Sequence, residues 1–566
     1  MTDSTQESDE ASQPHRLGPI AKLREWTIEA GALIVSRVSD NLAHFAADRQ
    51  LLVWGLAITI GIAVAHAAIA FRLLLGALQW LWLGTSSEHM LEAASNQYWF
   101  VILLAPAVGG LIVGVILQRF LPNGRAQGVA DVIEARAIGD CKINTRTGIW
   151  SALAAAITLG FGGSAGREGP VVHLGATIAS RLEDMFTLSA TTRRTLLACG
   201  VAAAVSASFN APIAGVLFAH EVILAHYALR AFVPIVLASV AGALISRIHF
   251  GSSAAFIIPD YQITSYLEFP AFVLLGITCA VVAILFELSI MITERLSWRI
   301  KMPLWLRPAC GGLAVGAIAI FLPQVLGVGY DATDMALKNQ WPLAVLLMLI
   351  VAKTVATAIT LASRMAGGVF SPSLYLGAMT GSAFGLIASS AFPEMASSNG
   401  LYALLGMGAV AAAVLGAPVS TTVIVFELTG GFEMTIALLL TVSVAHGLSH
   451  AVLGHSYFHW QLVQRGLSLH EGPHKEIMRR MRVSRFMTVL EPYEDPPGDL
   501  CPIEKSWLSP TDTLEDALRA FDRSGASRIP VVSSSDPDTV IGWADRATAI
   551  SSFNRALIAA HAEEHR

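Results

Sequence analysis

The residues best suited to chemistry are an arginine and a glutamate enclosed by glycines between long apolar runs, where Gly166–Pro170 reads Gly-Arg-Glu-Gly-Pro. An ionisable side chain inside a membrane is expensive and is a functional hypothesis by default. Glu168 would compete with a permeating anion, and protonation of Glu168 would clear the path. A structural partnership with Arg167 is the alternative. A helix that opens at Pro170 would add unpaired N–H groups and a positive dipole end, which suit an anion.

A matching element stands in the second half of the chain, where Gly367–Pro372 reads Gly-Gly-Val-Phe-Ser-Pro. It carries no charge, so its useful groups are the backbone N–H groups near Val369 and Phe370, again at a predicted helix start. Two facing helix N-termini would form an electropositive site without a buried cation. Such a site favours a small, weakly basic anion over a metal ion. A glycine pair that merely packs two helices is the alternative.

The elements that must hold these segments repeat along the chain. Each segment ends in a proline followed by Leu-Gly-Ala, and each half then has an Ala-Pro pair whose proline precedes a glutamate by nine residues. The two sets are Pro170, Pro212 and Glu221, and Pro372, Pro418 and Glu427. The paired prolines are 202 and 206 positions apart. We therefore predict two transmembrane repeats, 49–250 and 265–466, with a site where their broken helices converge. Hydropathy alone leaves inverted and parallel repeats open.

The bulk composition points to a membrane as the solvent. Of 566 residues, 54% are hydrophobic and 14% are charged, whereas an ordinary soluble protein has about 25% charged residues. Several apolar runs approach the ~20 residues that span a bilayer, among them Leu51–Ala70, Phe100–Leu117, Ala271–Ile292 and Leu343–Leu361. The chain is predicted to be an all-α polytopic membrane protein. Its net charge of -5 suggests no nucleic-acid partner, and its five scattered cysteines predict no metal site.

The two ends are predicted to lie outside the bilayer. In the N-terminal segment 1–48 we expect disorder over Met1–Leu17 and a helix over Pro19–Gln50, either amphipathic on the membrane surface or plainly cytoplasmic. No signal peptide is evident. In the C-terminal segment 467–566 we expect a linker helix over His470–Arg485, a loop over Pro492–Gly498 and a small α/β unit over Pro510–Phe553.

The α/β unit has recognisable elements. A helical stripe of Leu514, Ala517, Leu518 and Phe521 precedes two predicted strands, Ile529–Val532 and Val540–Trp543, and a last helix follows over Thr548–Ala560.

Two patterns resemble enzyme motifs but lack the partners those enzymes need. Ser164 lies in a G-x-S-x-G stretch, yet its flanks are predicted membrane helices instead of a strand and a helix. His220 and Glu221 begin an H-E-x-x-H pattern, but Leu224 stands where the second histidine belongs. We predict no catalytic residue. An intramembrane hydrolase that uses these residues is a remote alternative, and a secondary transporter for an organic anion or a cation is another.

The motifs together resemble those of the CLC family of chloride channels and proton-coupled chloride exchangers. Gly166–Pro170 and Gly368–Pro372 are similar to its GREGP and GxFxP signatures, and the two Ala-Pro…Glu segments are similar as well. The likeness covers about residues 50–466. It implies a homodimer with one pore per subunit, each subunit built from two inverted repeats of short, tilted and broken helices.

The resemblance also assigns roles by position. It implies that Glu168 gates the pore and carries the proton, that Arg167 and Gly169 belong to the anion site, and that Val369 and Phe370 supply backbone ligands. The C-terminal unit resembles a cytoplasmic CBS module, which implies a possible adenosine nucleotide. Only one CBS-like repeat is evident, so a structural or trafficking role is at least as well supported. No other cofactor is expected.

Two anion-binding positions depart from the family pattern. The family motif GSGIP aligns with Ala126–Ala130, so Gln127 replaces the anion-coordinating serine beside Gly128. The pore tyrosine aligns with Phe458, whereas Tyr457, one place earlier, would face about 100° away on a helix. An amide and a phenyl ring would then stand where relatives have hydroxyl groups.

The inner proton acceptor of the exchangers is missing as well. Proton-coupled members often have a glutamate directly after the position of Glu221, and this chain has Val222 there, as family channels do. His220 and His226 are nearby groups that titrate in a useful range, although a structural role is the simpler interpretation. These departures favour channel-like or weakly proton-coupled chloride transport, with a tightly coupled chloride/proton antiporter as the alternative. We expect a multi-pass protein of a bacterial cell (plasma or inner) membrane with both termini cytoplasmic.

Overall fold

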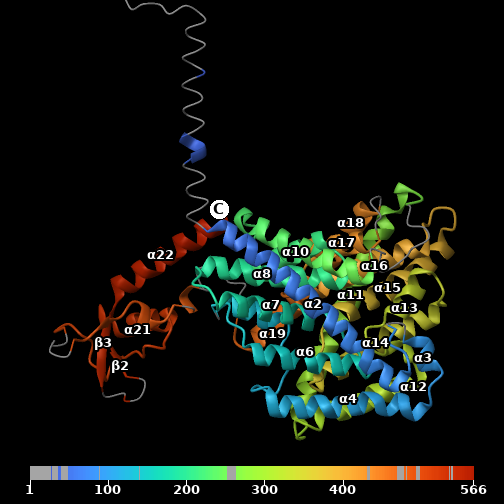
Figure 1. The fold of residues 1–566 in the computed structure, drawn as a ribbon, viewed down its shortest axis with the longest axis horizontal. Helices are drawn as coiled ribbons and strands as arrows, with labels where there is room; N and C mark the ends of the chain where they lie inside the picture. Colours follow the sequence, from blue (N-terminus) through green and yellow to red (C-terminus); the bar gives the residue numbers. More distant parts are fainter. Residues whose placement is uncertain are drawn as a thin grey trace, which may run out of the picture. The chain divides into compact units, whose positions relative to one another are not determined.

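The computed structural model describes residues 27, 36–39, 49–87, 90–138, 140–251, 263–429, 434–467, 477–479, 481–491, 497–533, 536 and 539–565. The predictions made for Met1–Leu17, Pro19–Gln50, His470–Arg485 and Pro492–Gly498 lie wholly or in large part outside these residues. Figure 1 shows the helices and strands in sequence colours.

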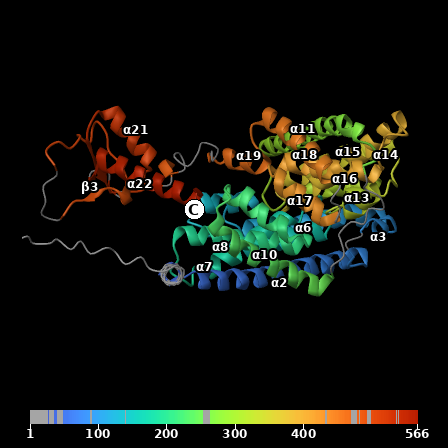
Figure 2. The ribbon, with the colours of Figure 1, turned by 90° about the horizontal axis from the view of Figure 1, so that it is seen from above.

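The helical region falls into two halves, and each half combines long helices with short ones. The first half holds α2 (Gln50–Leu83), α3 (Leu91–Ser95), α4 (Trp99–Phe120), α5 (Val129–Ala137), α6 (Thr145–Gly160), α7 (Glu168–Glu183), α8 (Ala190–Phe209), α9 (Pro212–Phe218), a π-helical turn (Ala219–Leu224) and α10 (Leu229–Phe250). The second half holds α11 (Phe269–Arg299), α12 (Arg307–Phe321), α13 (Tyr330–Leu337), α14 (Leu343–Ala362), α15 (Phe370–Ala391), α16 (Asn399–Leu415), α17 (Pro418–Thr429), α18 (Thr435–Leu453) and α19 (Tyr457–Gln464), with 3-10 turns at Tyr266–Glu268 and Pro323–Val325. In Figure 2 the blue and green helices of the first half lie largely on one side and the yellow and orange helices of the second half on the other.

Within the described residues, seven helical stretches are long and apolar enough to cross a membrane: Gln50–Leu83, Trp99–Phe120, Leu229–Phe250, Tyr266–Arg299, Leu343–Ala362, Phe370–Ala391 and Thr435–Gln464. The four spans predicted from apolar runs lie inside α2, α4, α11 and α14 and are confirmed. The chain is a multi-pass membrane protein.

The repeated Leu-Gly-Ala motif marks a close helix crossing in each half. Where α7 packs on α8, a Cβ at Gly175 would lie 2.5 Å from the carbonyl oxygen of Gly200. Where α15 packs on α16, a Cβ at Gly377 would lie 2.3 Å from the carbonyl oxygen of Gly406. Small residues let backbones approach in a membrane, where lipid provides no hydrophobic drive between helices. The same crossing occurs in both halves, as the predicted duplication requires.

The repeated Ala-Pro…Glu motif is explained by a reciprocal helix cap. Glu221 accepts hydrogen bonds from backbone N–H groups in the first turn of α17, those of Val419 at 3.1 Å and Ser420 at 2.7 Å. Glu427 makes the equivalent contacts with the first turn of α9, at 3.1 and 2.7 Å. A carboxylate there satisfies N–H groups that lack intrahelical partners and complements the helix dipole. Each half therefore caps a helix of the other, a two-fold exchange that inverted repeats produce.

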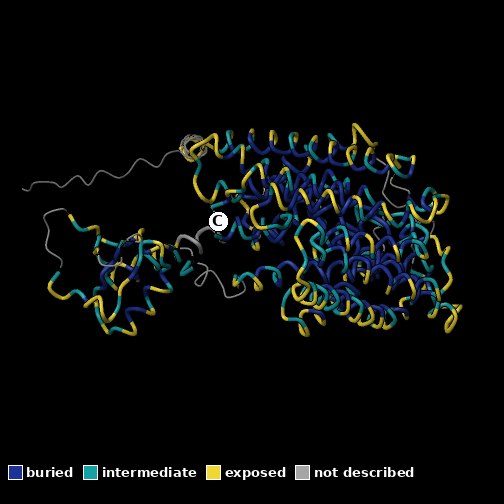
Figure 3. The backbone as a smooth tube through the Cα atoms, turned by 90° about the horizontal axis from the view of Figure 1, so that it is seen from below, coloured by how far each residue is buried: buried dark blue, intermediate teal, exposed yellow. Residues whose placement is uncertain are grey.

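The centre of the bundle is formed by α8 and α16, which are buried over most of their length. Figure 3 shows the buried backbone gathered in the middle of the helices and the exposed residues on the outer ones. The outer helices carry exposed apolar side chains such as Leu111 on α4, Val240 on α10 and Leu285 on α11. These side chains suit contact with lipid.

The C-terminal residues form a small α/β domain. Its antiparallel sheet has the order β1-β3-β2, from β1 (Thr488–Val489), β2 (Arg528–Val532) and β3 (Val540–Asp545), and it is accompanied by α21 (Leu514–Ser524) and α22 (Arg546–His565). The two predicted strands and both predicted helices are confirmed. Leu514, Ala517 and Phe521 are buried in the core of this domain, as the helical stripe predicted.

Candidate anion site

Two helix starts from opposite halves meet at the repeated glycine segments. Gly166 and Gly368 exchange backbone hydrogen bonds, at 2.7 Å from the first N–H and 2.8 Å from the second. The helices that follow begin at Glu168 and at Phe370. The prediction that the first helix opens at Pro170 is therefore two residues late. Proline is tolerated in a first helical turn because its missing N–H would have no intrahelical partner there, so Glu168 itself stands on the first turn.

The Glu168 carboxylate is buried, with 2% of the residue exposed, and its two oxygens have different surroundings. Oε1 accepts hydrogen bonds from the hydroxyls of Ser371 at 2.5 Å and Tyr330 at 3.4 Å, and Nε of Arg167 lies 3.8 Å away. Oε2 has no hydrogen-bond partner among the described residues. Gly166 makes room for this oxygen, because a Cβ there would lie 2.9 Å from it. One oxygen is thus held by hydrogen bonds, while the other is buried without a partner among the described residues.

Tyr330 is a partner of the carboxylate that the sequence did not reveal. It begins α13, and its hydroxyl accepts a hydrogen bond from Nη2 of Arg167 at 3.3 Å. The preceding segment is fixed by Lys353 of α14, whose Nζ donates to the carbonyls of Val325 at 3.0 Å and Gly327 at 2.9 Å. Because Tyr330 is 162 residues from its glutamate partner, no local spacing could have indicated the contact.

A cavity of about 260 Å³ lies at the two helix starts. The predicted site residues that line it are Gln127, Gly128, Glu168, Gly169, Val369, Phe370, Tyr457 and Phe458. Four other predicted residues, Arg167, His220, Glu221 and Val222, are not among its lining residues in the described part of the chain. Arg167 instead stacks over Tyr330, with 5.0 Å from Cζ to the ring centroid.

Tyr457, which the sequence places about 100° around the helix from Phe458 as a pore-lining or nearby residue, lines the cavity together with Phe458. The cavity follows α19 lengthwise, and Gln461, one turn further on, also lines it. The Tyr457 hydroxyl accepts a hydrogen bond from Nε2 of Gln461 at 3.0 Å. A phenol group is therefore present in the cavity wall, one residue before the family's position.

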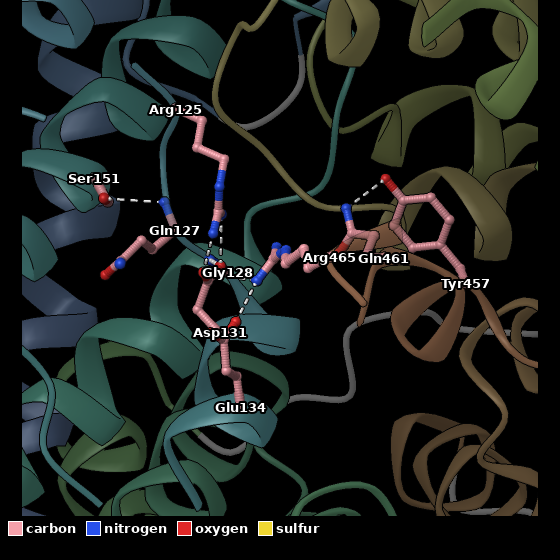
Figure 4. A network of polar contacts seen from close by, with 9 residues as sticks. All are labelled: Arg125, Gln127, Gly128, Asp131, Glu134, Ser151, Tyr457, Gln461 and Arg465. Atoms are coloured by element: carbon pink, nitrogen blue, oxygen red, sulfur yellow. Dashed lines mark hydrogen bonds and ion pairs between the residues drawn. The ribbon is translucent and has the colours of Figure 1, made fainter. Parts of the chain in front are cut away.

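A network of charged side chains fixes the wall of the cavity near Gly128 (Figure 4). Asp131 pairs with Nη2 of Arg125 at 2.6 Å and with Nη1 of Arg465 at 3.0 Å, and it accepts the N–H of Gly128 at 2.9 Å. Arg465 also pairs with Glu134 at 2.8 Å. The Gly128 N–H is thus engaged by Asp131, and the network ties the end of α19 to the start of α5.

Ser151 of α6 is a second residue that sequence reasoning missed. Its hydroxyl accepts the backbone N–H of Gln127 at 3.1 Å, which Figure 4 shows, and it lines the cavity. The hydroxyl hydrogen of Ser151 remains able to donate. A hydroxyl donor therefore lies beside the amide that replaces the family's serine, although it comes from a different helix.

The remaining candidates from the sequence do not assemble into an enzyme site. The hydroxyl of Ser164 contacts that of Thr357 at 3.2 Å, and Nδ1 of His220 contacts the carbonyl of His226 at 3.0 Å. Within the described residues, no group of three or more metal-ligating side chains is present. At one cavity two helix N-termini meet, and three arginines (Arg125, Arg364 and Arg465) are matched in number by three carboxylates (Asp131, Glu168 and Glu294); the two helix N-termini suit an anion.

The comparisons with known proteins agree with this class. Residues 109–450 match the voltage gated chloride channel family. The chain is 33% identical over 396 residues to a ClcB-like chloride channel protein of Ralstonia nicotianae, which covers 69% of this chain and 92% of that protein. It is 29% identical over 382 residues to the H(+)/Cl(-) exchange transporter ClcA of Vibrio cholerae, covering 65% of this chain and 80% of that one.

A solved structure of a slow cyanobacterial Cl-/H+ antiporter has the same fold, with a TM-score of 0.65 at 21% identity over 74% of this chain and 99% of that one. The chain belongs to the voltage gated chloride channel family, the CLC family, and the predicted family and fold class are confirmed. Members of this family are transporters and channels, not enzymes.

Proposed function

We propose that this protein moves chloride across a membrane through the cavity at the starts of α7 and α15, with Glu168 as its gate. The observation that carries the proposal is the position of the Glu168 carboxylate, which is held through one oxygen, has no partner at the other and lines the cavity. An ionised carboxylate there occupies the place that the helix N-termini offer to an anion. Protonation or displacement of Glu168 removes this competitor. A membrane potential supplies about 2.3 kcal/mol per charge per 100 mV, which drives anions without ATP.

The anion ligands we propose are groups of the cavity wall: the side-chain amide of Gln127, the hydroxyl of Ser151 and the backbone N–H groups at Gly169, Val369 and Phe370. An amide and a serine hydroxyl both donate to an anion. They compensate for the hydroxyl groups that relatives have at the positions of Gln127 and Phe458.

Channel-like or weakly proton-coupled transport is the mode we propose, because Val222 provides no carboxylate at the family's inner proton position. Relatives with channel names and relatives with exchanger names are both similar to this chain. A tightly coupled chloride/proton antiporter is the alternative, and one observation favours it, namely a second carboxylate, Glu294, in the same cavity wall.

For the rest of the protein we propose a homodimer with one pore per subunit in a bacterial cell membrane, with both termini cytoplasmic. The C-terminal α/β domain is proposed to be a CBS-like module that either binds an adenosine nucleotide or has a structural role. Its single sheet with two helices is the supporting observation.

The gate is tested by chloride efflux from proteoliposomes that contain the wild type or Glu168→Ala. We expect the variant to conduct at neutral pH at least as fast as the wild type and to lose the pH dependence of efflux, because the titrating competitor is gone. The control is Glu92→Gln, which alters an exposed carboxylate on α3. A Glu168→Ala protein with unchanged flux and unchanged pH dependence would disprove the gate.

A further inference from the structure

Glu294 is a carboxylate that lines the same cavity as Glu168, but it comes from α11. The charges of Arg364, Arg465 and Arg125 act on it. Within the described residues, no hydrogen bond or ion pair joins its carboxylate to any of them. Glu294 is only half-buried and lines the cavity, so water in the cavity can reach it and exchange a proton with it.

Glu287 stands seven residues before Glu294 on α11, two helical turns away on the same face of the helix. It is fully buried, with 0% exposed, and neither of its oxygens has a hydrogen-bond partner among the described residues. An isolated ionised carboxylate in an apolar interior is very expensive, whereas the neutral acid is not. The surroundings of Glu287 therefore favour a carboxyl group that holds a proton.

Tyr457 lines the same cavity as Glu294. Its hydroxyl lies within electrostatic range of both Glu294 and Glu287, and its side chain lines the cavity together with Glu168. The hydroxyl oxygen accepts from Gln461 at 3.0 Å, which leaves its own hydrogen able to donate. The cavity wall therefore carries a phenol able to donate as well as two carboxylates, Glu168 and Glu294.

We infer that Glu294 is the inner proton donor and acceptor of this protein, in place of the carboxylate that Val222 lacks, and that Glu287 is a buried proton store behind it. This inference rests on the weakly proton-coupled form of the proposed function and deepens it, because it gives the Glu168 gate a source of protons from the second half of the chain. A polar cavity of about 260 Å³ is roomy enough for several water molecules.

The proton transfers balance without any further reactant. The Glu294 carboxylate takes a proton from hydronium in solution, which leaves a water molecule and a neutral carboxylic acid. Its O–H bond then breaks as a proton passes along cavity water and a new O–H bond forms on Glu168, which leaves Glu294 ionised and Glu168 neutral. Glu287 exchanges a proton with Glu294 reversibly, so that the O–H bond broken on one carboxyl group is formed on the other.

The other titratable groups on helices packed against α11 mostly make contacts of their own, although the Tyr375 hydroxyl and Nδ1 of His446 have no hydrogen-bond partner among the described residues. Lys353 of α14 binds the carbonyls of Val325 and Gly327, and Tyr375 of α15 lies beside that lysine. Tyr402 of α16 donates to Glu268 at the opposite end of the helix, and His446 and His450 of α18 stack on each other. The groups that act on the glutamate pair are therefore the three arginines and Tyr457.

The test uses the full chain in liposomes with an imposed chloride gradient, and it records chloride flux and proton movement together. We expect the wild type to move protons uphill. Glu294→Gln should lower the proton-to-chloride ratio at least tenfold while chloride flux stays within about twofold, and Glu294→Asp should restore at least half of the ratio. Glu287→Gln should lower the ratio severalfold, and the control Glu92→Gln should leave it unchanged.

The outcomes separate this inference from the proposed function. A wild type without chloride flux overturns the proposed function. A wild type that moves chloride but no protons overturns only the proton pathway, as does a Glu294→Gln protein that retains its proton-to-chloride ratio. Loss of chloride flux in Glu294→Gln would show that this residue supports the anion path or the fold, which also refutes a proton-specific role.

Discussion

The hydroxyl of Ser371 makes the shortest contact of the Glu168 carboxylate, and its removal has a calculable effect. At 2.5 Å the contact lies in the range of charge-assisted O–H···O⁻ bonds, and hydrogen bonds to charged groups contribute about 1.5–3 kcal/mol. Since every ~1.4 kcal/mol is a factor of ten, Ser371→Ala should weaken the state with Glu168 in place by roughly 10- to 150-fold. Chloride flux at neutral pH should rise, up to the limit set by Glu168→Ala.

The assay is the initial rate of chloride efflux from proteoliposomes at neutral and at acidic pH. Ser373→Ala is the matched control, because this buried serine donates to the carbonyl of Phe370 in its own helix at 2.6 Å and has no contact with the gate. The increase should vanish when Ser371→Ala is combined with Glu168→Gln. An increase that persists in that background would mean that the substitution widens the path, and an unchanged flux would mean that the hydroxyl does not hold the gate. Either result refutes the reasoning.

Two further predictions follow from other contacts. Tyr330→Phe removes a longer hydrogen bond to Glu168, of 3.4 Å, which contributes about 0.5–1.5 kcal/mol. Chloride efflux should therefore rise about 2- to 10-fold, less than for Ser371→Ala. A larger rise than that of Ser371→Ala would contradict this ranking. Asp545→Ala removes the acceptor of the first N–H groups of α22, at 2.9 and 3.1 Å, and should destabilise that helix by about 1 kcal/mol, seen as faster hydrogen exchange at its first amides. Burial alone would raise the pKa of Asp545. Hydrogen bonds from the Thr548 N–H and from Arg528 outweigh this effect, so the pKa lies below the ordinary 3.8. The stabilisation of α22 by Asp545 is therefore present above pH ~3.9 and is lost as the pH falls through the folded-state pKa. Equal rates of hydrogen exchange in the wild type and Asp545→Ala at neutral pH would contradict this prediction.

The backbone of the fold was predictable because the residues that shape it recur in the sequence. A close helix crossing needs a small residue and a helix start favours a proline, so a duplicated fold repeats both at nearly the same offset. Gly175 and Gly377 occupy equivalent crossings for this reason. The spacing of the glutamates after each Ala-Pro pair is visible in the sequence, but their role as helix caps follows only from contacts such as that of Glu221 with the first turn of α17.

Three other side chains at the cavity or beside Glu168 were not predictable, since they come from elements far away in the sequence. Tyr330, Ser151 and Glu294 reach the site from α13, α6 and α11, and none of them shares a motif with Glu168. Ser371 lies inside a segment that the sequence singles out, but the motif points to the backbone N–H groups of Val369 and Phe370 and not to the Ser371 hydroxyl. Its hydroxyl could have been noticed as the one polar side chain of that segment.

The site depends on positions at which the two halves have diverged. Ser151 and Lys353 are 202 positions apart, the same separation as Gly166 and Gly368, so they are equivalent in the duplication. Lys353 spans from α14 to two carbonyls and fixes the segment that carries Tyr330, whereas the short Ser151 side chain ends at the Gln127 N–H and lines the cavity. A lysine at 151 would bring an ammonium group into the place where we put the anion. In the same way, Gly169 is equivalent to Ser371, so only one half supplies a carboxylate and only the other supplies the hydroxyl that holds it. The duplication provides two facing helix starts, and these unequal residues confine the gate that we propose to a single side chain, Glu168.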